Sequence, residues 1–353
     1  MTSPDGAGCP RPILDHPCVV AGHGGGGALS RELVERIFLP AFADPLLDRL
    51  GDSTPLDGVD GLAGGRLALS TDSYVVRPLF FPGGSIGELA VHGTVNDLAM
   101  SGAMAKVLTV GFILEEGLPF GDLVEVAERM GTAARAAGVR IVAGDTKVVE
   151  RGRGDGLYVN TTGLGVIPAS GGPGSEPVRP GDVVLASGTL GDHGMAIMSV
   201  REGLAFDAPI VSDTAALHGL VAAMLAACPA IRLLRDPTRG GAAASLNEMA
   251  ALSGAAIEIR ERDIPVDSTV AAACEILGLD PLEVANEGKL LAVVPEEGAE
   301  ALLAAMRSHP LGRRATAIGR VVAGPPGRVT MKTALGTTRI VPLPLGELLP
   351  RIC

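Results

Sequence analysis

The stretch RLALSTDSYVVRPLFFPGGSIGELAVHGTVNDLAMSGA, residues 66–103, contains a strand pattern followed by a helix pattern. RLALSTD at its start predicts a strand. The segment at 85–103 repeats apolar residues with helical spacing, among them Ile86, Leu89 and Leu98, and predicts a helix. The order of these two patterns predicts the first strand–helix unit of an α/β domain.

The alternation of strands and helices continues through the first half of the chain. The sequence predicts a strand at 106–116, a helix at 122–138 and further strands at 139–149 and 156–167. Gly138 ends the helix, because glycine readily adopts the left-handed conformation found at many helix ends. The expected fold class is therefore α/β (α+β).

A change in composition divides the chain into domains. The segment PASGGPGSEPVRPG at 168–181 is dense in Pro and Gly, which favours a linker, and DVVLASG directly after it begins a second α/β unit. Prolines 342, 344 and 350 predict an extended arm at the end of the chain. The predicted parts are a disordered lead, an N-terminal domain, a C-terminal α/β domain and a flexible cysteine-bearing tail, at residues 1–18, 19–168, 169–341 and 342–353.

The composition excludes several classes of protein. A net charge of -11 argues against a nucleic-acid binder, which needs clustered Lys and Arg. The five cysteines are odd in number and widely spaced, so neither a disulfide framework nor a zinc site is expected. The first residues show no signal-peptide pattern, and no run of 18 apolar residues predicts a membrane span. We expect a cytoplasmic protein.

A glycine-rich segment, Gly-His-Gly-Gly-Gly-Gly at 22–27, fits the dinucleotide-binding pattern GxGxxG. That fold requires a second strand soon afterwards. Residues 40–58, PAFADPLLDRLGDSTPLDG, are rich in turn formers and do not predict one. A loop whose backbone closes over phosphates is the better interpretation.

A second short pattern, Gly-Gly-Ser-Ile-Gly at 83–87, matches the nucleophile elbow GxSxG. Pro82 stands where the elbow needs a strand, and Ser85 with Glu88 has the spacing of a helix capping box. Capping is therefore the favoured role of Ser85. A Walker A motif is absent from the sequence, since Gly288-Lys289 is followed by leucine.

Four aspartates occupy predicted strand ends and helix starts, most of them beside Gly, Thr or Asn: Asp72, Asp97, Asp145 and Asp236. A single aspartate in a turn is usually a cap. Mg²⁺ prefers carboxylate oxygens and bridges nucleotide phosphates. Together with the glycine-rich loop, the four residues predict an ATP site of a non-Walker type.

Eight sequence strings appear in an order that identifies a family: HGGGG, STDSYVVRPLFFPGGSIGELAVHGTVNDLAMSGA, GFILEEGLP, VAGDTKVV, SGTLGDHG, DPTRGG, ANEGKL and the terminal PRIC. Together they resemble the HypE family, the carbamoyl dehydratases of nickel–iron hydrogenase maturation. The resemblance extends from about Val19 to Cys353. It implies an aminoimidazole ribonucleotide synthetase-like fold of two α/β domains, in which the N-terminal domain binds ATP and pairs into a homodimer.

The resemblance also implies a reaction. A partner carbamoyltransferase, HypF, loads a carboxamide onto the thiol of Cys353. ATP with Mg²⁺ then drives dehydration of the carboxamide to a thiocyanate, and the cyano group passes to iron held by a HypC–HypD complex. Phosphoryl transfer to the amide oxygen makes that oxygen a leaving group, and catalysis of such a step depends mostly on positioning and charge neutralisation.

The resemblance assigns roles to residues at matching positions. Glu287 is the expected base and Lys147 the residue that stabilises developing charge, while Cys353 carries the substrate. The expected metal ligands are Asp72, Asp97 and Asp145, with Asp236 as a fourth. The expected nucleotide contacts are the metal ligands Asp72, Asp97 and Asp145 together with His23, Gly24, Gly25, Gly26, Asn96 and Thr146.

Two alternatives remain at the level of sequence. Another ATP-using enzyme of the same superfamily, such as a selenophosphate synthetase or a thiamine-phosphate kinase, would not need Cys353. A non-catalytic carrier that only presents a modified cysteine would not turn over ATP, and the aspartate set with Lys147 and Glu287 argues against it.

Overall fold

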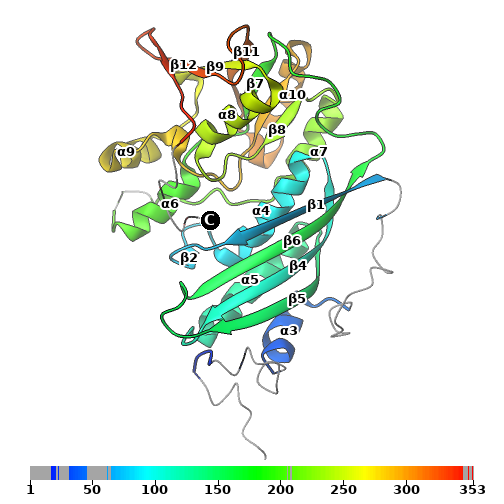
Figure 1. The fold of residues 1–353 in the computed structure, drawn as a ribbon, viewed down its shortest axis with the longest axis vertical. Helices are drawn as coiled ribbons and strands as arrows, with labels where there is room; N and C mark the ends of the chain where they lie inside the picture. The colour runs from blue at the N-terminus through cyan, green and yellow to red at the C-terminus, as the bar shows by residue number, and fades with distance from the viewer. Residues whose placement is uncertain are drawn as a thin grey trace, which may run out of the picture.

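The computed structural model describes residues 17–20, 23, 32–45, 62, 65–204, 206, 209–344, 349 and 352. Most of the predicted lead, the glycines at 24–26 and Cys353 lie outside the described residues. The chain forms two sheet-based halves, seen one above the other in Figure 1. The mixed α/β class expected from the sequence is confirmed.

The N-terminal half is built on a four-stranded sheet with the strand order β1-β6-β4-β5. Strand β6 pairs antiparallel with both β1 and β4, whereas β4 and β5 are parallel. The sheet strands are β1 (Gly65–Tyr74), β4 (Met104–Glu115), β5 (Arg140–Val149) and β6 (Leu157–Pro168). Each predicted strand of this half is present, so local pattern was sufficient to find them.

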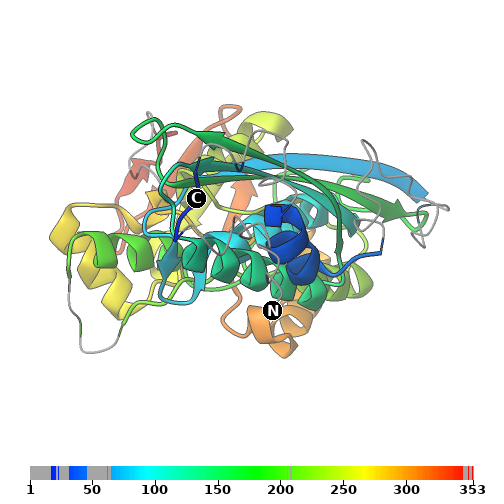
Figure 2. The same cartoon turned by 90° about the horizontal axis from the view of Figure 1, so that it is seen from below.

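Two helices cover one face of this sheet, as the view from below in Figure 2 shows. They are α4 (Ile86–Met100) and α5 (Phe120–Ala136). They pack closely, because a Cβ atom on Gly87 would lie 2.4 Å from the backbone oxygen of Val126. Smaller elements are the π-helical turn η2 (Val34–Phe38), α3 (Leu39–Phe42) and the short strands β2 (Phe80–Phe81) and β3 (Gly84–Ser85).

The start of α4 confirms the capping role predicted for Ser85. The Ser85 hydroxyl oxygen accepts a hydrogen bond from the Gly87 amide at 3.2 Å, and the hydroxyl donates to Glu88 at 2.6 Å. These bonds satisfy a helix amide that would otherwise lack a partner. Ser85 is therefore a helix cap and has no features of a nucleophile elbow.

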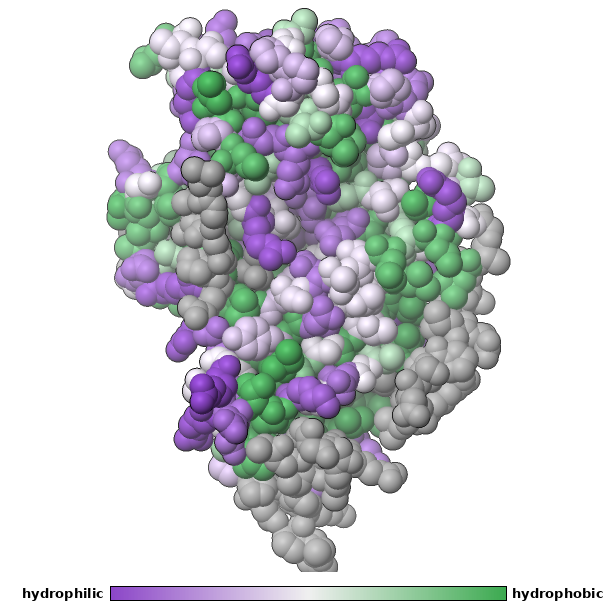
Figure 3. All heavy atoms as spheres, in the orientation of Figure 1, coloured by the Kyte–Doolittle hydropathy of each residue, from purple (hydrophilic) through white to green (hydrophobic). Residues whose placement is uncertain are grey.

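The other face of the four-stranded sheet is open in the single chain. Leu67, Leu69, Met104 and Ile113 expose between 43% and 71% of their surface there. Figure 3, drawn in the orientation of Figure 1, shows green apolar side chains among polar ones over this sheet. We call this surface the open face.

The C-terminal half contains a seven-stranded sheet with the order β13-β12-β9-β11-β7-β10-β8. One apolar cluster includes residues of α7 and α10, and a second cluster includes residues of α8. The strands are β7 (Val183–Ala186), β8 (Leu233–Arg235), β9 (Ala256–Arg260), β10 (Leu291–Val294), β11 (Thr316–Val322), β12 (Val329–Lys332) and β13 (Thr338–Ile340). The helices are α6 (Asp192–Arg201), α7 (His218–Ala227), α8 (Gly241–Ser253), α9 (Ser268–Leu277) and α10 (Glu296–Ser308), with 3₁₀ turns at Glu261–Asp263, Pro281–Glu283 and Pro310–Gly312.

Residues 169–182, between β6 and β7, contain neither helix nor strand. At the other end of the N-terminal half, Pro17 and Cys18 belong to the sequence assigned to the lead, yet Cys18 forms a bridge with Pro119. The exact domain boundaries stay predictions.

Cys228 and Cys274 are buried, as expected. Among the described residues, no helix has both the length and the apolar character needed to cross a bilayer.

Candidate active site

A small acidic cavity lies where the two halves meet. Its volume is about 20 Å³, enough for one water-sized sphere. It is lined by Asp72, Ser73, Gly93, Asp97, Asp236, Thr238, Arg239 and Glu287. We call these residues the acidic pocket. It brings three of the four predicted metal ligands together with the predicted base.

The N-terminal half supplies two of the carboxylates from adjacent elements. Asp72 lies on β1 and is paired with the buried Thr161, so its side chain is on the sheet face covered by α4. Asp97 lies in the last turn of α4 and accepts a hydrogen bond from the Ser70 hydroxyl at 2.7 Å. Gly93 allows helix and strand to approach, because a Cβ atom there would lie 2.2 Å from the Tyr74 hydroxyl.

The carboxylates of the acidic pocket perturb one another. Burial raises the pKa of Asp97, and the nearby charge of Asp72 raises it further. Burial, with the charge of Asp97 as the next cause, raises the pKa of Asp236 to about 7. Arg239 approaches Asp72 at 3.4 Å, but its side chain is 65% exposed. Crowded carboxylates of this kind favour a bound cation.

The donor set fits Mg²⁺, which takes carboxylate and water oxygens. In the part of the chain that the structure describes, no three acidic, His or Cys side chains are close enough to hold one ion by themselves. Water molecules would therefore complete the ligand set, as is usual for Mg²⁺.

Glu287 is held at the pocket by both halves of the molecule. Its side chain is 3% exposed. Its backbone amide donates to Asp213 Oδ1 at 3.0 Å, and its backbone oxygen accepts from Asn96 Nδ2 at 3.1 Å. The preceding residue, Asn286, accepts from the Gly191 amide at 2.7 Å. These bonds fix the position of the Glu287 backbone.

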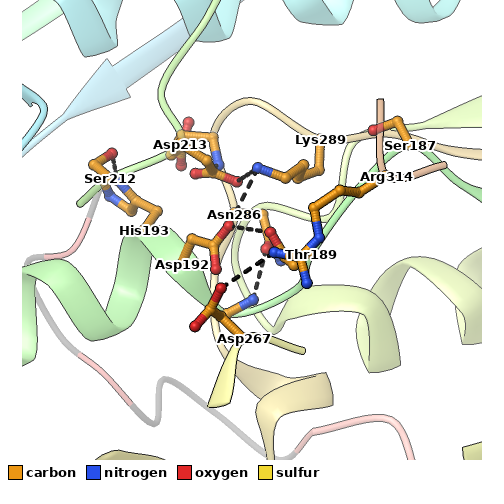
Figure 4. A network of polar contacts seen from close by, with 12 residues as sticks. Ser187, Thr189, Asp192, His193, Ser212, Asp213, Asp267, Asn286, Lys289 and Arg314 are labelled. Atoms are coloured by element: carbon orange, nitrogen blue, oxygen red, sulfur yellow. Dashed lines mark hydrogen bonds and ion pairs between the residues drawn. The ribbon is translucent and has the colours of Figure 1, made fainter. Parts of the chain in front are cut away.

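A second group of charged residues, drawn in Figure 4, lies close to the segment that carries Glu287. Lys289 Nζ lies 3.1 Å from Asp213 Oδ2 and 3.3 Å from Asp192 Oδ2. All three side chains are at most 15% exposed. Gly288 allows the close approach, because a Cβ atom there would lie 1.8 Å from the Asp213 oxygen. We call Asp192, Asp213 and Lys289 the lysine network.

Asn96 has a structural role in the described chain, and its predicted nucleotide contact stays a prediction. It is 1% exposed, and its Oδ1 accepts from the Leu217 amide at 2.7 Å. Its Nδ2 donates to Ala215 O at 3.0 Å and to Glu287 O. Because both amide protons are used, Asn96 joins α4 to the C-terminal half and positions Glu287.

Asp145, Thr146 and Lys147 do not reach the acidic pocket of their own chain. They lie on β5, and the strand order places β5 and β1 at opposite edges of the sheet, about 14 Å apart at ~4.8 Å per strand. Asp145 lies in one register row with Gly111, Asn160 and Ser73. Residues in such a row share a face, so Asp145 is on the open face, as is Lys147 two residues later.

The glycine-rich loop can be judged only at His23, since Gly24, Gly25 and Gly26 are outside the described residues. His23 is fully buried, its ring lies edge-on to Phe120 at 5.1 Å, and its Nδ1 accepts from the Val20 amide. The His23 side chain therefore anchors the start of the loop in the core.

Sequence analysis missed several residues of the site. Thr238 and Arg239 lie in the string DPTRGG, and Asp192 and Lys289 lie in SGTLGDHG and ANEGKL. Their presence in those strings was the available signal. Ser73 and Gly93 lie in the string at 70–103, whereas Asp213 lies in none of the strings.

Comparison with known proteins identifies the family. Residues 59–167 match the N-terminal domain of the AIR synthase related proteins, and residues 179–332 match their C-terminal domain. "Carbamoyl dehydratase HypE" of Azotobacter vinelandii is 55% identical over 331 residues, which cover 94% of this chain and 96% of the relative. The chain belongs to the HypE family of carbamoyl dehydratases.

Solved structures of the HypE family agree with this assignment. A crystal structure of hydrogenase maturation protein HypE in complex with ATP has a TM-score of 0.88 and 49% identity, covering 95% of this chain and 99% of the other. A HypE–HypF complex has a TM-score of 0.76 and 48% identity, covering 88% and 99%. The predicted AIR synthetase-like fold is thereby confirmed.

Proposed function

We propose that this chain dehydrates a carbamoyl group carried on the sulfur of Cys353, with consumption of ATP. The balance is S–C(=O)NH₂ plus ATP giving S–C≡N plus ADP and phosphate, so the amide oxygen leaves within the phosphate. The observation that supports this best is that Glu287 lines the same small cavity as Asp72, Asp97 and Asp236. A base and a set of cation ligands are then available at one place.

The chain's own residues have three tasks in this reaction. Asp72, Asp97 and Asp236 would hold Mg²⁺ by their carboxylate oxygens, while the loop at 23–27 binds nucleotide phosphates. When bound, MgATP supplies the phosphoryl group that turns the amide oxygen into a leaving group. Glu287 accepts the amide protons, and its burial excludes water that would compete for that position.

The active unit in this proposal is a homodimer formed through the open face. A second copy would cover Leu67, Leu69 and Met104, which one chain leaves exposed. In a two-fold dimer with two sheets face to face and the axis along the strands, β5 of one copy lies over β1 of the other. This arrangement would bring Asp145 and Lys147 of one copy towards the acidic pocket of the other, where Lys147 would stabilise developing charge.

Mixing two inactive variants tests the shared site. Asp97→Asn and Lys147→Ala each disable every site of their own homodimers. If Lys147 acts across the dimer, a random mixed dimer has one intact site, and an equal mixture recovers roughly a quarter of the wild-type dehydration rate. Absence of recovery, in mixtures shown to contain mixed dimers, would place Lys147 in the site of its own chain or outside any site.

The family assignment also suggests partners and location. The solved HypE–HypF complex supports a HypF carbamoyltransferase as the enzyme that loads Cys353. A HypC–HypD complex as the cyanide acceptor follows from the family resemblance. The described cysteines Cys18, Cys228 and Cys274 are free thiols, which is consistent with the proposed cytoplasmic location.

The decisive experiment weighs the C-terminal peptide. The purified protein is carbamoylated by its transferase, MgATP is added and the peptide ending at Cys353 is analysed. We expect loss of one water from the carbamoylated peptide in the wild type, and a rate at least roughly 100-fold lower in Glu287→Gln. Glu297→Gln, on the exposed start of α10, is the matched control and should match the wild type. Equal rates in both glutamate variants would remove Glu287 as the base, and retention of the carbamoyl group in the wild type would contradict the proposed function.

A further inference from the structure

The second-last residue of the chain is buried although chain ends are normally loosely held. Ile352 is 2% exposed and belongs to the large apolar cluster that includes Phe81, Ile197 and Ala285. Leu349 packs against the same cluster. The tail can therefore leave this site only if the Ile352 side chain first leaves the apolar cluster.

One hydrogen bond holds the backbone of Ile352. The distance between His193 Nε2 and the Ile352 carbonyl oxygen is 2.9 Å. Since a carbonyl oxygen only accepts, Nε2 carries the proton and donates it. The His193 Nδ1 then accepts from the Ser212 hydroxyl at 2.7 Å. Ser212 in turn is held to the N-terminal half, because its amide donates to Pro82 O at 2.8 Å.

The histidine itself is held rigidly. It is fully buried, and its ring meets Phe81 edge-on with the ring centres 5.5 Å apart. Burial lowers the pKa of His193, so the neutral form that uses one nitrogen as donor and the other as acceptor is favoured. The Ile352 carbonyl oxygen sets which nitrogen carries the proton, and the Ser212 hydroxyl can donate to the other nitrogen.

The same elements hold the tail and the base. His193 is the second residue of α6, and the amide of the next residue, Gly194, donates to Ala285 O at 3.0 Å. Ala285 lies two residues before Glu287. Ser212 directly precedes Asp213, which accepts from the Glu287 amide. A tail bonded to His193 is therefore aligned by the segments that also place Glu287.

We propose that His193 and Ser212 form a latch that holds Ile352 and thereby positions the Cys353 sulfur for dehydration. The inference rests on the proposed function, in which Cys353 carries the substrate. His193 is a positioning residue in this account, since it bonds the backbone next to the reacting residue. Because consecutive Cα atoms are about 3.8 Å apart, a fixed Ile352 restricts the volume that the next sulfur can sample. A latch of one hydrogen bond and one apolar side chain can still open for loading by another enzyme.

The test measures how often the tail leaves, through the rate at which iodoacetamide alkylates Cys353. The rate is followed by mass spectrometry of the C-terminal peptide, with and without MgATP. We expect His193→Phe, which keeps an aromatic ring but has no donor, to raise the Cys353 rate roughly 5- to 30-fold. His193→Gln, whose amide can donate to Ile352 O, should remain near the wild-type rate. The buried Cys228 and Cys274 report on folding, because they react only if the fold opens.

A second variant keeps the test decisive if His193→Phe disturbs the fold. Ile352→Ala removes the apolar anchor at the end of the chain and should also raise the Cys353 rate, whereas Leu343→Ala, at a side chain already 55% exposed, should not. Unchanged Cys353 rates in both His193→Phe and Ile352→Ala, under both conditions and with Cys228 and Cys274 protected, would overturn the latch.

The alkylation assay requires no turnover, so the two proposals fail separately. If the wild type does not dehydrate its carbamoyl group but the latch variants expose Cys353, the function is wrong and the latch stands. If dehydration occurs but the alkylation rates do not change, the latch is wrong and the function stands. If the proposed function and the latch are both correct, His193→Phe should slow single-turnover dehydration, whereas His193→Gln should dehydrate at a rate near that of the wild type.

Discussion

The acidic pocket and the lysine network both include a residue of the segment at 284–290, Glu287 in the first and Lys289 in the second, and both contain aspartates. In the lysine network, Lys289 lies within 3.3 Å of both Asp192 and Asp213, and the Glu287 amide donates to Asp213. In the acidic pocket, Arg239 lies 3.4 Å from Asp72, and the Arg239 side chain is 65% exposed. The counter-charge of the lysine network is buried, whereas the cation at the acidic pocket is largely exposed.

This difference indicates a structural role for the lysine network and a functional role for the acidic pocket. Matched buried charges keep a loop in place, since breaking such a pair leaves an uncompensated charge. Unmatched carboxylates raise one another's pKa, and strongly perturbed groups in a cleft mark functional sites. By this criterion the lysine network positions Glu287, and the acidic pocket is the place for a cation and phosphates.

The largest expected effect comes from breaking the matched cluster. Lys289→Met leaves Asp192 and Asp213 buried without their cation, and we expect the free energy of unfolding to fall by about 3–5 kcal/mol. The control is Arg320→Met, which breaks an exposed pair with Glu296 and should cost less than about 1 kcal/mol. Urea unfolding measures both. Similar small losses in the two variants would show that the lysine network is not a scaffold.

Removing a charge from the acidic pocket should raise the free energy of unfolding, whereas Lys289→Met should lower it. The pKa of Asp236 is raised from 3.8 to about 7 in the folded protein. Its protonated form is therefore favoured by folding, and this stability is present below pH ~4 and is lost as the pH rises to about 7. Asp236→Asn should accordingly be more stable than the wild type at pH 8 without Mg²⁺, by up to about 4 kcal/mol at ~1.4 kcal/mol per pKa unit.

The pH and metal dependence of this effect provide its controls. The advantage of Asp236→Asn should vanish near pH 4, where the wild-type carboxyl is protonated, and should shrink when Mg²⁺ is added. Asp263→Asn, at a side chain that is 39% exposed, should stay within about 0.5 kcal/mol of the wild type. If Asp236→Asn were less stable than the wild type at pH 8, the charge of Asp236 would already be compensated within the acidic pocket.

Asn96 joins α4 to the Glu287 segment. Its replacement should have the smallest of the three effects on the free energy of unfolding. Asn96→Ala removes three hydrogen bonds and leaves buried backbone groups without partners, so unfolding should become easier by about 1–3 kcal/mol. Dehydration should slow while the dissociation constant for ATP changes little, because Asn96 acts through the Glu287 backbone.

The matched control for Asn96 is Asn247→Ala on α8. Asn247 also donates to two backbone oxygens, but within the C-terminal half and away from Glu287. It should lose stability without a change in the dehydration rate per folded molecule. A large loss of ATP affinity in Asn96→Ala alone would restore the nucleotide contact that the sequence suggested.

Local features were predictable from the sequence, and contacts between distant segments were not. Asp72 at a strand end and Asp97 near a helix end follow from periodicity, and the structure brings them together. Asn96 was predicted only as a nucleotide contact, and its hydrogen bonds with Ala215, Leu217 and Glu287 could not be predicted. These partners are more than 100 residues away, beyond the range of any local pattern.

Strand order was the other limit. Asp145 and Lys147 lie on β5, where the sequence predicted a strand at 139–149, but the order β1-β6-β4-β5 separates them from β1. Periodicity predicts that strands exist and does not determine which strands are neighbours. Lys289 was weighed only as part of a Walker motif, and its real partners, Asp192 and Asp213, are far apart in the sequence.

The most direct test is to locate the metal ion. Mn²⁺ accepts the same oxygen ligands as Mg²⁺ and is visible by anomalous scattering. In crystals of the protein grown with Mn²⁺ and a non-hydrolysable ATP analogue, we predict an anomalous peak within reach of Asp72, Asp97 and Asp236. A nucleotide-bound crystal with no peak there, or with the peak at Asp192 and Asp213, would contradict the account.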